Sequence, residues 1–240
     1  MPKTPPLCIC ETVSKHMKKI IILILISCSF LQTNGQNIDK TYYLLGTLKD
    51  YCGRQYPKNN PTQWNYVIIL HQSKFGEIKR IEEVTKKKFK KHRKKKGCSN
   101  CQEFYELKSY GRARKLNSFY EFEKKKGWKD QMGFTFYTGT LICDKLLNSS
   151  ENQQLSFIAG LFLTSGEKKS DNYSISLFNS SDRFECAKQI LLNLGAKIEN
   201  EEIDNNIPNG YYLEFIPSEK IRKIIENEIL RRNTLANKGS

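Results

Sequence analysis

Helix and strand signals alternate along residues 150–231, and this alternation constrains the fold more than any other feature of the chain. Ser150 and Gln153 form a capping-box pattern before an apolar run, which predicts a helix that stops near Gly166. Residues 173–178 then alternate large apolar side chains with serines, as a half-buried strand does. The same reasoning predicts a helix over 181–195, a weaker strand over 196–203, a strand over 211–216 and a helix over 218–231.

A weaker version of this pattern precedes it. The predicted elements are a short helix over 41–50, a strand over 64–70, an amphipathic helix over 74–89, a strand over 104–107, a helix over 113–126 and a strand over 133–143. This alternation predicts the α+β class, with duplicated ferredoxin-like or αββαββα-type units and helices packed on one face of antiparallel sheets. We therefore expect a basic α+β half at 36–145, a second α+β half at 146–231 and a polar tail at 232–240.

Residues 41–229 resemble two tandem units of the LAGLIDADG homing endonucleases. In the second unit, FIAGLFLTSGE at 157–167 resembles the motif helix, and a helix ending in Leu194-Gly195, a strand and a closing helix follow in the family's order. In the first unit, LLGTL at 44–48 resembles a weaker motif. The resemblance implies two motif helices packed against each other at Gly46 and Gly160, in a protein that binds DNA or RNA.

The sequence departs from this family where the family cleaves phosphodiesters. There the acid before the motif's last glycine binds a metal ion that activates water, which requires hard oxygen ligands. That position is Tyr51 in the first unit and Ser165 in the second, and Asp50 is offset by one residue. The resemblance therefore implies a binding protein without catalytic residues; if the protein is an enzyme after all, it is an endonuclease of this type.

Residues 172–216 also resemble the sporulation-related repeat domain, which binds glycan strands of the bacterial cell wall. The order of a strand, a helix and a later strand is similar, although Ile216-Pro217 stands where that family has Gly-Pro. Convergence on a ferredoxin-like pattern would explain both resemblances without implying a function.

The N-terminal region has the pattern of an export signal at residues 17–35. Lysines are followed by about a dozen apolar residues, which is too short for a membrane span, and then by the polar segment that leads to Gln36. Residues 1–16 do not share this character and are left out of the fold. Cleavage before Gln36 competes with a lipid anchor at Cys28, and the alternative to export is a buried helix or strand of a cytosolic protein.

Positive charge dominates the composition. The formal net charge is +15, and it is +12 without the four lysines and one glutamate of residues 1–35. One block holds nine basic residues in eleven positions: Lys86, Lys87, Lys88, Lys90, Lys91, Arg93, Lys94, Lys95 and Lys96. Such a block can neutralise phosphates or carboxylates, or it can be a solvated loop. We therefore expect an exported, non-enzymatic protein that contacts an acidic polymer (an envelope glycan, lipid head groups or nucleic acid). The alternative is a LAGLIDADG-type protein that binds or cleaves DNA or RNA.

A second basic cluster interleaves with aromatic residues along 110–128. At helical spacing Leu116, Phe119 and Tyr120 are expected in the core, whereas aromatics beside cations could instead stack bases or sugars.

The five cysteines after residue 35 include one close pair, Cys98 and Cys101. A structural disulfide, a metal site and a redox pair are all open for it, although a zinc site would need two further ligands. His71 has no evident catalytic partner and is expected to be structural. With no glycine-rich phosphate loop either, we expect no cofactor.

Overall fold

The computed structural model describes residues 37–58, 65–92, 103–125, 127–130 and 133–238. Residues 38–240 form one compact unit. Several predictions concern residues outside the described part: residues 1–16, the export signal with Cys28, Arg93 to Lys96, and the pair Cys98 and Cys101. No helix in the described ranges is long and apolar enough to cross a membrane.

The first half forms an αββαββα unit. Its elements are α2 (Lys40–Thr47), β1 (Arg54–Pro57), β2 (Tyr66–His71), the short helix η2 (Gln72–Lys74), α3 (Phe75–Thr85), β3 (Lys90–His92), β4 (Phe104–Lys108) and α4 (Tyr110–Asn117). Three strands and a short helix follow before the second unit: β5 (Tyr120–Phe122), β6 (Trp128–Lys129), β7 (Thr135–Leu141) and α5 (Cys143–Leu147).

The second half repeats the αββαββα order without such an addition. Its elements are α6 (Glu151–Ser165), β8 (Gly166–Lys169), β9 (Asn172–Phe178), α7 (Ser181–Asn193), β10 (Lys197–Asp204), β11 (Gly210–Ile216) and α8 (Glu219–Asn237). The segment 172–216 forms the middle of this unit and shares its sheet with β8. The predicted class and duplication are therefore confirmed.

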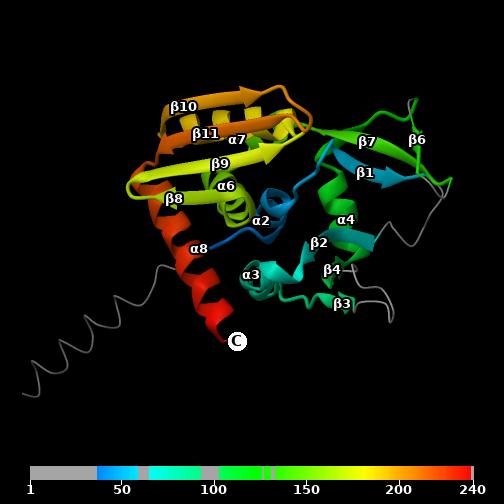
Figure 1. The fold of residues 1–240 in the computed structure, drawn as a ribbon, viewed down its shortest axis with the longest axis horizontal. Coiled ribbons are helices and arrows are strands. Elements are labelled where there is room, and N and C mark those ends of the chain that lie inside the picture. Colours follow the sequence, from blue (N-terminus) through cyan, green and yellow to red (C-terminus); the bar gives the residue numbers. More distant parts are fainter. Residues whose placement is uncertain (1–36, 59–64, 93–102, 126, 131–132, 239–240) are drawn as a thin grey trace, which may run out of the picture. The chain divides into compact units, whose positions relative to one another are not determined.

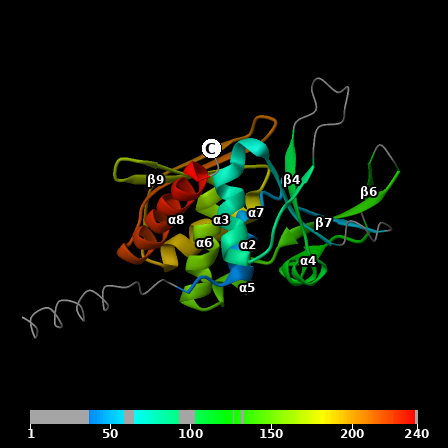
Figure 2. The ribbon, with the colours of Figure 1, turned by 90° about the horizontal axis from the view of Figure 1, so that it is seen from below.

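The sheets explain how the two units correspond. The second unit has an antiparallel sheet in the order β10-β11-β9-β8. The first unit has β3-β4-β2, which is the same order except that the strand corresponding to β8 is missing. That strand, β1, pairs instead with β7 in a third sheet, β1-β7-β5, in which β6 also pairs with β7. The helices α2 and α6 lie between the sheets of the two units (Figures 1 and 2).

Several predicted boundaries are wrong, for reasons of tertiary packing. The helix expected over 113–126 ends at Asn117, because Tyr120 and Phe122 pair with Leu141 and Gly139 as strand β5. The helix expected to end at residue 231 continues to Asn237, where it packs against α3. Helical spacing alone could not reveal either partner.

Candidate functional site

The two motif helices, α2 and α6, pack at their glycines. A Cβ built on Gly46 would lie 2.1 Å from the carbonyl oxygen of Phe157 and 2.7 Å from the amide nitrogen of Leu161. A Cβ on Gly160 would lie 2.0 Å from the carbonyl oxygen of Tyr43 and 3.2 Å from the amide nitrogen of Thr47. Each glycine thus meets the residue three positions before the other glycine and the residue one position after it. Such reciprocal contacts are expected when two helices pack about a two-fold axis. In the structure, α2 and α6 thus pack against each other at Gly46 and Gly160.

The two helices run in the same direction. At their N-terminal ends, the backbone N–H of Asp39 donates to Ser156 Oγ at 2.9 Å, and the amide of Gln153 donates to the Asp39 carboxylate at 3.4 Å. The C-terminal ends therefore lie on one side of the molecule, where the family's metal-binding acids would converge.

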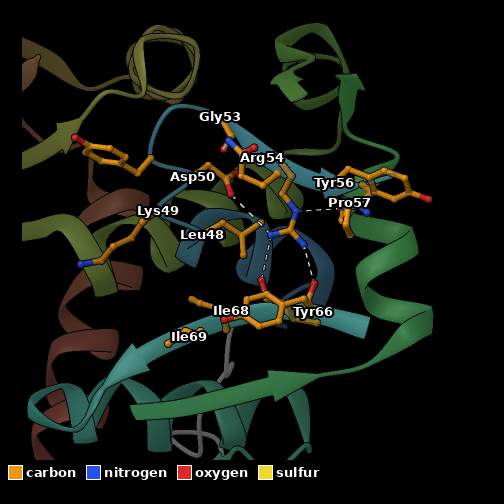
Figure 3. Close-up of a pocket in the computed structure, with 14 residues that line it drawn as sticks. Leu48, Lys49, Asp50, Gly53, Arg54, Tyr56, Pro57, Tyr66, Ile68 and Ile69 are labelled. Atoms are coloured by element: carbon orange, nitrogen blue, oxygen red, sulfur yellow. Dashed lines mark hydrogen bonds and ion pairs between the residues drawn. The ribbon is translucent and has the colours of Figure 1, made fainter. Parts of the chain in front are cut away.

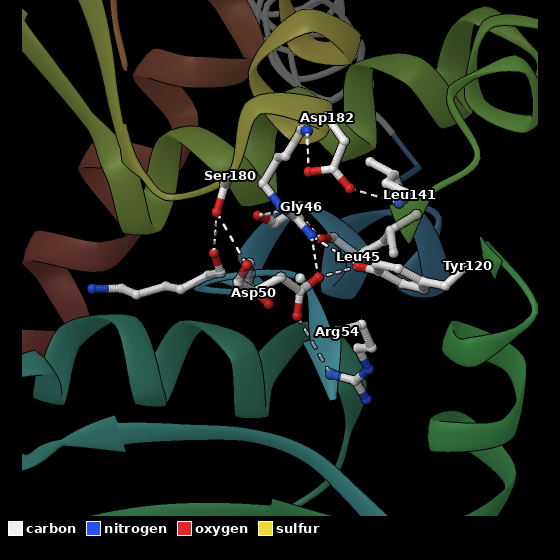
Figure 4. A network of polar contacts seen from close by, with 12 residues as sticks. Leu45, Gly46, Asp50, Arg54, Tyr120, Leu141, Ser180 and Asp182 are labelled. Atoms are coloured by element: carbon white, nitrogen blue, oxygen red, sulfur yellow. Dashed lines mark hydrogen bonds and ion pairs between the residues drawn. The ribbon is translucent and has the colours of Figure 1, made fainter. Parts of the chain in front are cut away.

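Asp50 is held in a buried cluster at this end of α2 (Figure 4). Its carboxylate accepts a hydrogen bond from Arg183 Nη2 at 2.7 Å and another from the Tyr120 hydroxyl, and Arg54 Nη1 lies 3.8 Å away. Burial, followed by the charge of Asp50, raises the pKa of Tyr120 well above its usual value, so the hydroxyl keeps its proton. Tyr51, by contrast, is exposed.

Arg183 connects this cluster to the helix terminus. Its Nη1 donates to the carbonyl oxygen of Leu45 at 2.7 Å and to that of Gly46 at 3.5 Å, which are among the groups that the end of α2 leaves unpaired. The side chain is 1% exposed. Burial lowers the pKa of Arg183, but the neighbouring Tyr120 and Asp50 outweigh it, so the pKa is raised and the charge is retained.

These residues do not fit the metal that the family resemblance implies. Tyr51 and Ser165 supply no carboxylate, and the carboxylate of Asp50 is already neutralised by arginine. No cluster of three or more histidine, cysteine, aspartate or glutamate residues in the described ranges could hold a metal ion.

A cavity of about 410 Å³ opens beside this cluster, between β1 and β2 (Figure 3). The guanidinium of Arg54 crosses it and donates to the carbonyl oxygens of Val67 at 3.1 Å and Tyr66 at 3.0 Å, and to Asn117 Oδ1 at 3.0 Å. Arg54 thus replaces the backbone hydrogen bonds that β1 would make with β2. Three of its five N–H groups are occupied in this way, so Arg54 holds the two strands together.

The described part of the lysine block surrounds the start of β3. Lys86 ends α3 with a positive φ of 55°, and Lys86, Lys87, Lys88, Lys90 and Lys91 are all exposed. Lys88 lies 3.5 Å from a Glu82 carboxylate oxygen, and Lys91 lies 2.7 Å from one of Glu103. No carboxylate of the described chain pairs with Lys86, Lys87 or Lys90, so these three are available to an anion.

The two histidines of the described chain lie on the same sheet. His71 accepts a hydrogen bond from the Ser73 N–H at 3.1 Å, and His92 Nε2 lies 2.7 Å from the Glu106 carboxylate. His71 therefore caps η2, which fits the expected structural role.

The second basic cluster separates into core and surface. Leu116, Phe119 and Tyr120 are buried, as expected. Tyr110 and Trp128, by contrast, are 55% and 45% exposed. Helical spacing could not separate these exposed aromatics from the buried ones, because Trp128 belongs to a strand. Cys143 of α5 and the buried Cys186 of α7 form a hydrogen bond between their thiols. This hydrogen bond lowers the pKa of the Cys143 thiol.

Charge is divided unequally between the two units. Residues 36–145 contain 25 lysines and arginines against 11 aspartates and glutamates, a net charge of +14, whereas residues 146–240 contain 11 against 13, a net charge of −2. In the second unit's sheet, Glu202 is opposite Tyr212 and Asn200 is opposite Glu214, so acidic side chains share one face. The excess of positive charge thus lies in residues 36–145.

No family model matches the chain, and no curated protein matches it. Among solved structures, it is similar to mesophilic variants of the homing endonuclease I-DmoI, at 17% identity over 80% of this chain and 94% of that chain, with a TM-score of 0.45. It is also similar to I-DmoI in complex with DNA and Ca, at 16% identity over 81% and 88% of the two chains (TM-score 0.46). A third similar structure is full-length DUF199/WhiA from Thermatoga maritima, at 12% identity over 84% of this chain and 62% of that chain (TM-score 0.36).

Proposed function

We propose that the protein binds nucleic acid through its first unit and does not cleave it. The observation that carries this proposal is the division of charge, +14 against −2, between two units with the same αββαββα order. Salt-sensitive attraction to a phosphate backbone needs cations that are not already paired, and Lys86, Lys87 and Lys90 meet this condition.

Two further observations support nucleic acid as the polymer and argue against cleavage. The paired glycines Gly46 and Gly160 reproduce the motif-helix contact implied by the LAGLIDADG resemblance, which links the chain to proteins that bind DNA or RNA. The same helices end in Tyr51 and Ser165, and the nearby Asp50 is held by Arg183. The fold is thus retained without the ligands for the metal.

The test is fluorescence anisotropy with a labelled DNA oligonucleotide, single-stranded and as a duplex, between 50 and about 300 mM salt. Replacing Lys86, Lys87 and Lys90 by glutamine should weaken binding by about tenfold or more at the lowest salt. It should also reduce the slope of log K against log salt by about 2 to 3, because each lost phosphate contact removes about 0.7 to 0.9. A control with the same loss of charge replaces Lys169, Lys197 and Lys223, three exposed lysines of the second unit, and should change affinity less than about twofold. Lys169 and Lys197 pair with Glu167 and Glu199, unlike the three lysines of the first unit.

Three results would contradict the proposal. Binding that persists at about 1 M salt, where screening acts over roughly 3 Å, would exclude an electrostatic contact. Nicking of plasmid DNA with Mg²⁺ that is lost in Asp50→Asn would show that the protein is a nuclease. Tighter binding to a sulfated glycan than to either DNA form would favour an acidic glycan as the partner.

A further inference from the structure

The strands β5, β6 and β7 have no counterpart in the second unit. They lie between α4, which closes the first αββαββα unit, and α6, which opens the second. In Figure 1 the sheet that they form with β1 lies beside α4. Neither the duplication nor the family resemblance explains this addition, so its exposed side chains are candidates for a role of their own.

One aromatic pair stands out on this sheet. Trp128 of β6 lies directly opposite Phe136 of β7, and their rings are stacked with centroids 5.0 Å apart and planes 22° from parallel. Phe136 is 7% exposed whereas Trp128 is 45% exposed. The indole therefore covers the phenyl ring and leaves the other part of its surface open to solvent.

One hydrogen bond and one stacked ring hold the indole. Trp128 Nε1 donates to Gln55 Oε1 at 2.8 Å, and the Gln55 amide nitrogen donates to the carbonyl oxygens of Cys52 at 3.4 Å and Gly53 at 3.3 Å. The indole is thus held by a ring beneath it and an acceptor at its edge before any ligand arrives. An aromatic ring that is already immobilised loses little entropy on binding.

The surroundings of Trp128 are cationic. Lys124, Lys125 and Lys129 are exposed, and no carboxylate of the described chain forms an ion pair with them. Two acids, Glu123 and Asp130, also lie close to Trp128 in the sequence, so residues 123–130 contain four lysines against two carboxylates, a net charge of +2. The acidic Glu121 pairs with Thr140, four residues along β7 from Phe136, which is roughly 13 Å at the usual rise per residue. A phosphate next to a ring stacked on Trp128 would therefore meet cations.

We propose that Trp128 is a stacking platform for an unpaired nucleobase, and this rests on the proposed binding of nucleic acid. Stacking on an aromatic side chain requires an open base face, which a duplex hides between neighbouring base pairs and exposes only at its ends. The platform therefore favours a single strand over a duplex, while Lys86, Lys87 and Lys90 contribute charge to both.

The experiment uses the full chain with Trp64→Phe, which leaves Trp128 as the sole tryptophan. Titration with a 12-nucleotide oligo(dT) should quench the emission of Trp128, and the matching oligo(dT)·oligo(dA) duplex should not. In anisotropy, Trp128→Ala should weaken single-strand binding by about 5- to 150-fold, the range for one lost base stack, and change duplex binding less than about twofold. Trp128→Phe should recover part of the loss.

Controls separate this inference from a folding defect and from the proposed function. Phe178→Ala removes an exposed aromatic residue of the second unit and should leave binding unchanged, and thermal unfolding should show that Trp128→Ala remains folded. If the lysine variants weaken binding while Trp128→Ala does not and emission is unchanged, the platform is disproved and nucleic-acid binding stands. Quenching by a neutral oligosaccharide instead of oligo(dT) also overturns it, and absence of all nucleic-acid binding refutes the proposed function itself.

Discussion

Arg183 joins parts of the chain that lie far apart in the sequence. It belongs to α7 of the second unit, yet it contacts Asp50 and the C-terminal carbonyls of α2 in the first unit and the Tyr120 hydroxyl of β5. A buried charge is costly unless it is paired and hydrogen-bonded, and both terminal nitrogens of Arg183 have partners here, whereas its Nε has none among the described residues. Arg183 therefore takes the place beside Asp50 that a metal ion would otherwise require.

Replacement of Arg183 by methionine should lower the free energy of unfolding by about 3 to 5 kcal/mol, because it leaves Asp50 buried without its main partner. Chemical denaturation measures this change. Adding Asp50→Asn should recover part of the loss, since the two residues act as a pair. The control is Arg231→Ala, which breaks an exposed ion pair with Glu83 and should cost less than about 1 kcal/mol. If the double variant lost as much free energy of unfolding as the two single variants together, the coupling between Arg183 and Asp50 would be disproved.

At the scale of elements, the contact between α2 and α6 depends on two glycines. The side of each helix that faces the other has no room for a Cβ, because the nearest atoms belong to the backbone and cannot rotate away. The helices can approach closely only while both positions are glycine. This contact brings the first unit against the second and places both motif-helix ends on one side.

Gly46→Ala and Gly160→Ala should each lower the free energy of unfolding by about 3 kcal/mol or more, since overpacking here meets rigid backbone. Gly111→Ala is the matched control: its added Cβ has no atom within 4 Å, and it lies in α4, so stability should be unchanged or rise by up to about 1 kcal/mol. Thermal or urea unfolding measures all three variants. A tolerated alanine at Gly46 would mean that the helices are not in such close contact.

At the scale of the whole molecule, the two units share an order of helices and strands but differ in net charge. The second unit repeats the order of helices and strands but has a net charge of −2. The proposed attraction of nucleic acid therefore rests on the first unit. Export through residues 17–35 remains our prediction, and it would place this binding outside the cytoplasm.

N-terminal sequencing of the protein recovered from its native host tests this prediction. We expect the mature chain to begin at Gln36, because the apolar run is too short to anchor the chain and ends before a polar segment. A lipidated Cys28 would still mean export, but with a membrane anchor. An intact N-terminus on protein from the cytosol would refute export and leave intracellular nucleic acid as the ligand.

Local patterns in the sequence were sufficient for the class, the duplication and most of the second unit. The cap at Ser150 and the alternation of residues 173–178 report helix and strand directly, because each depends on neighbours in the chain. The glycines Gly46 and Gly160 were recognised through their motifs. The missing acids at Tyr51 and Ser165 were likewise visible from the sequence, since the identity of a residue can be read without its surroundings.

Only the tertiary structure decided the partners of these residues. From the sequence, Asp50 was a carboxylate one position away from the expected metal-ligand position. The structure shows that Arg183, more than 130 residues away in the sequence, neutralises it. Strand β5 was expected to be helical, because pairing with β7 leaves no trace in helical spacing. Trp128 could not be distinguished from a core aromatic until its position over Phe136 showed one ring buried and the other exposed. Contacts between distant segments depend on the global fold, and a periodicity of neighbouring residues carries no information about them.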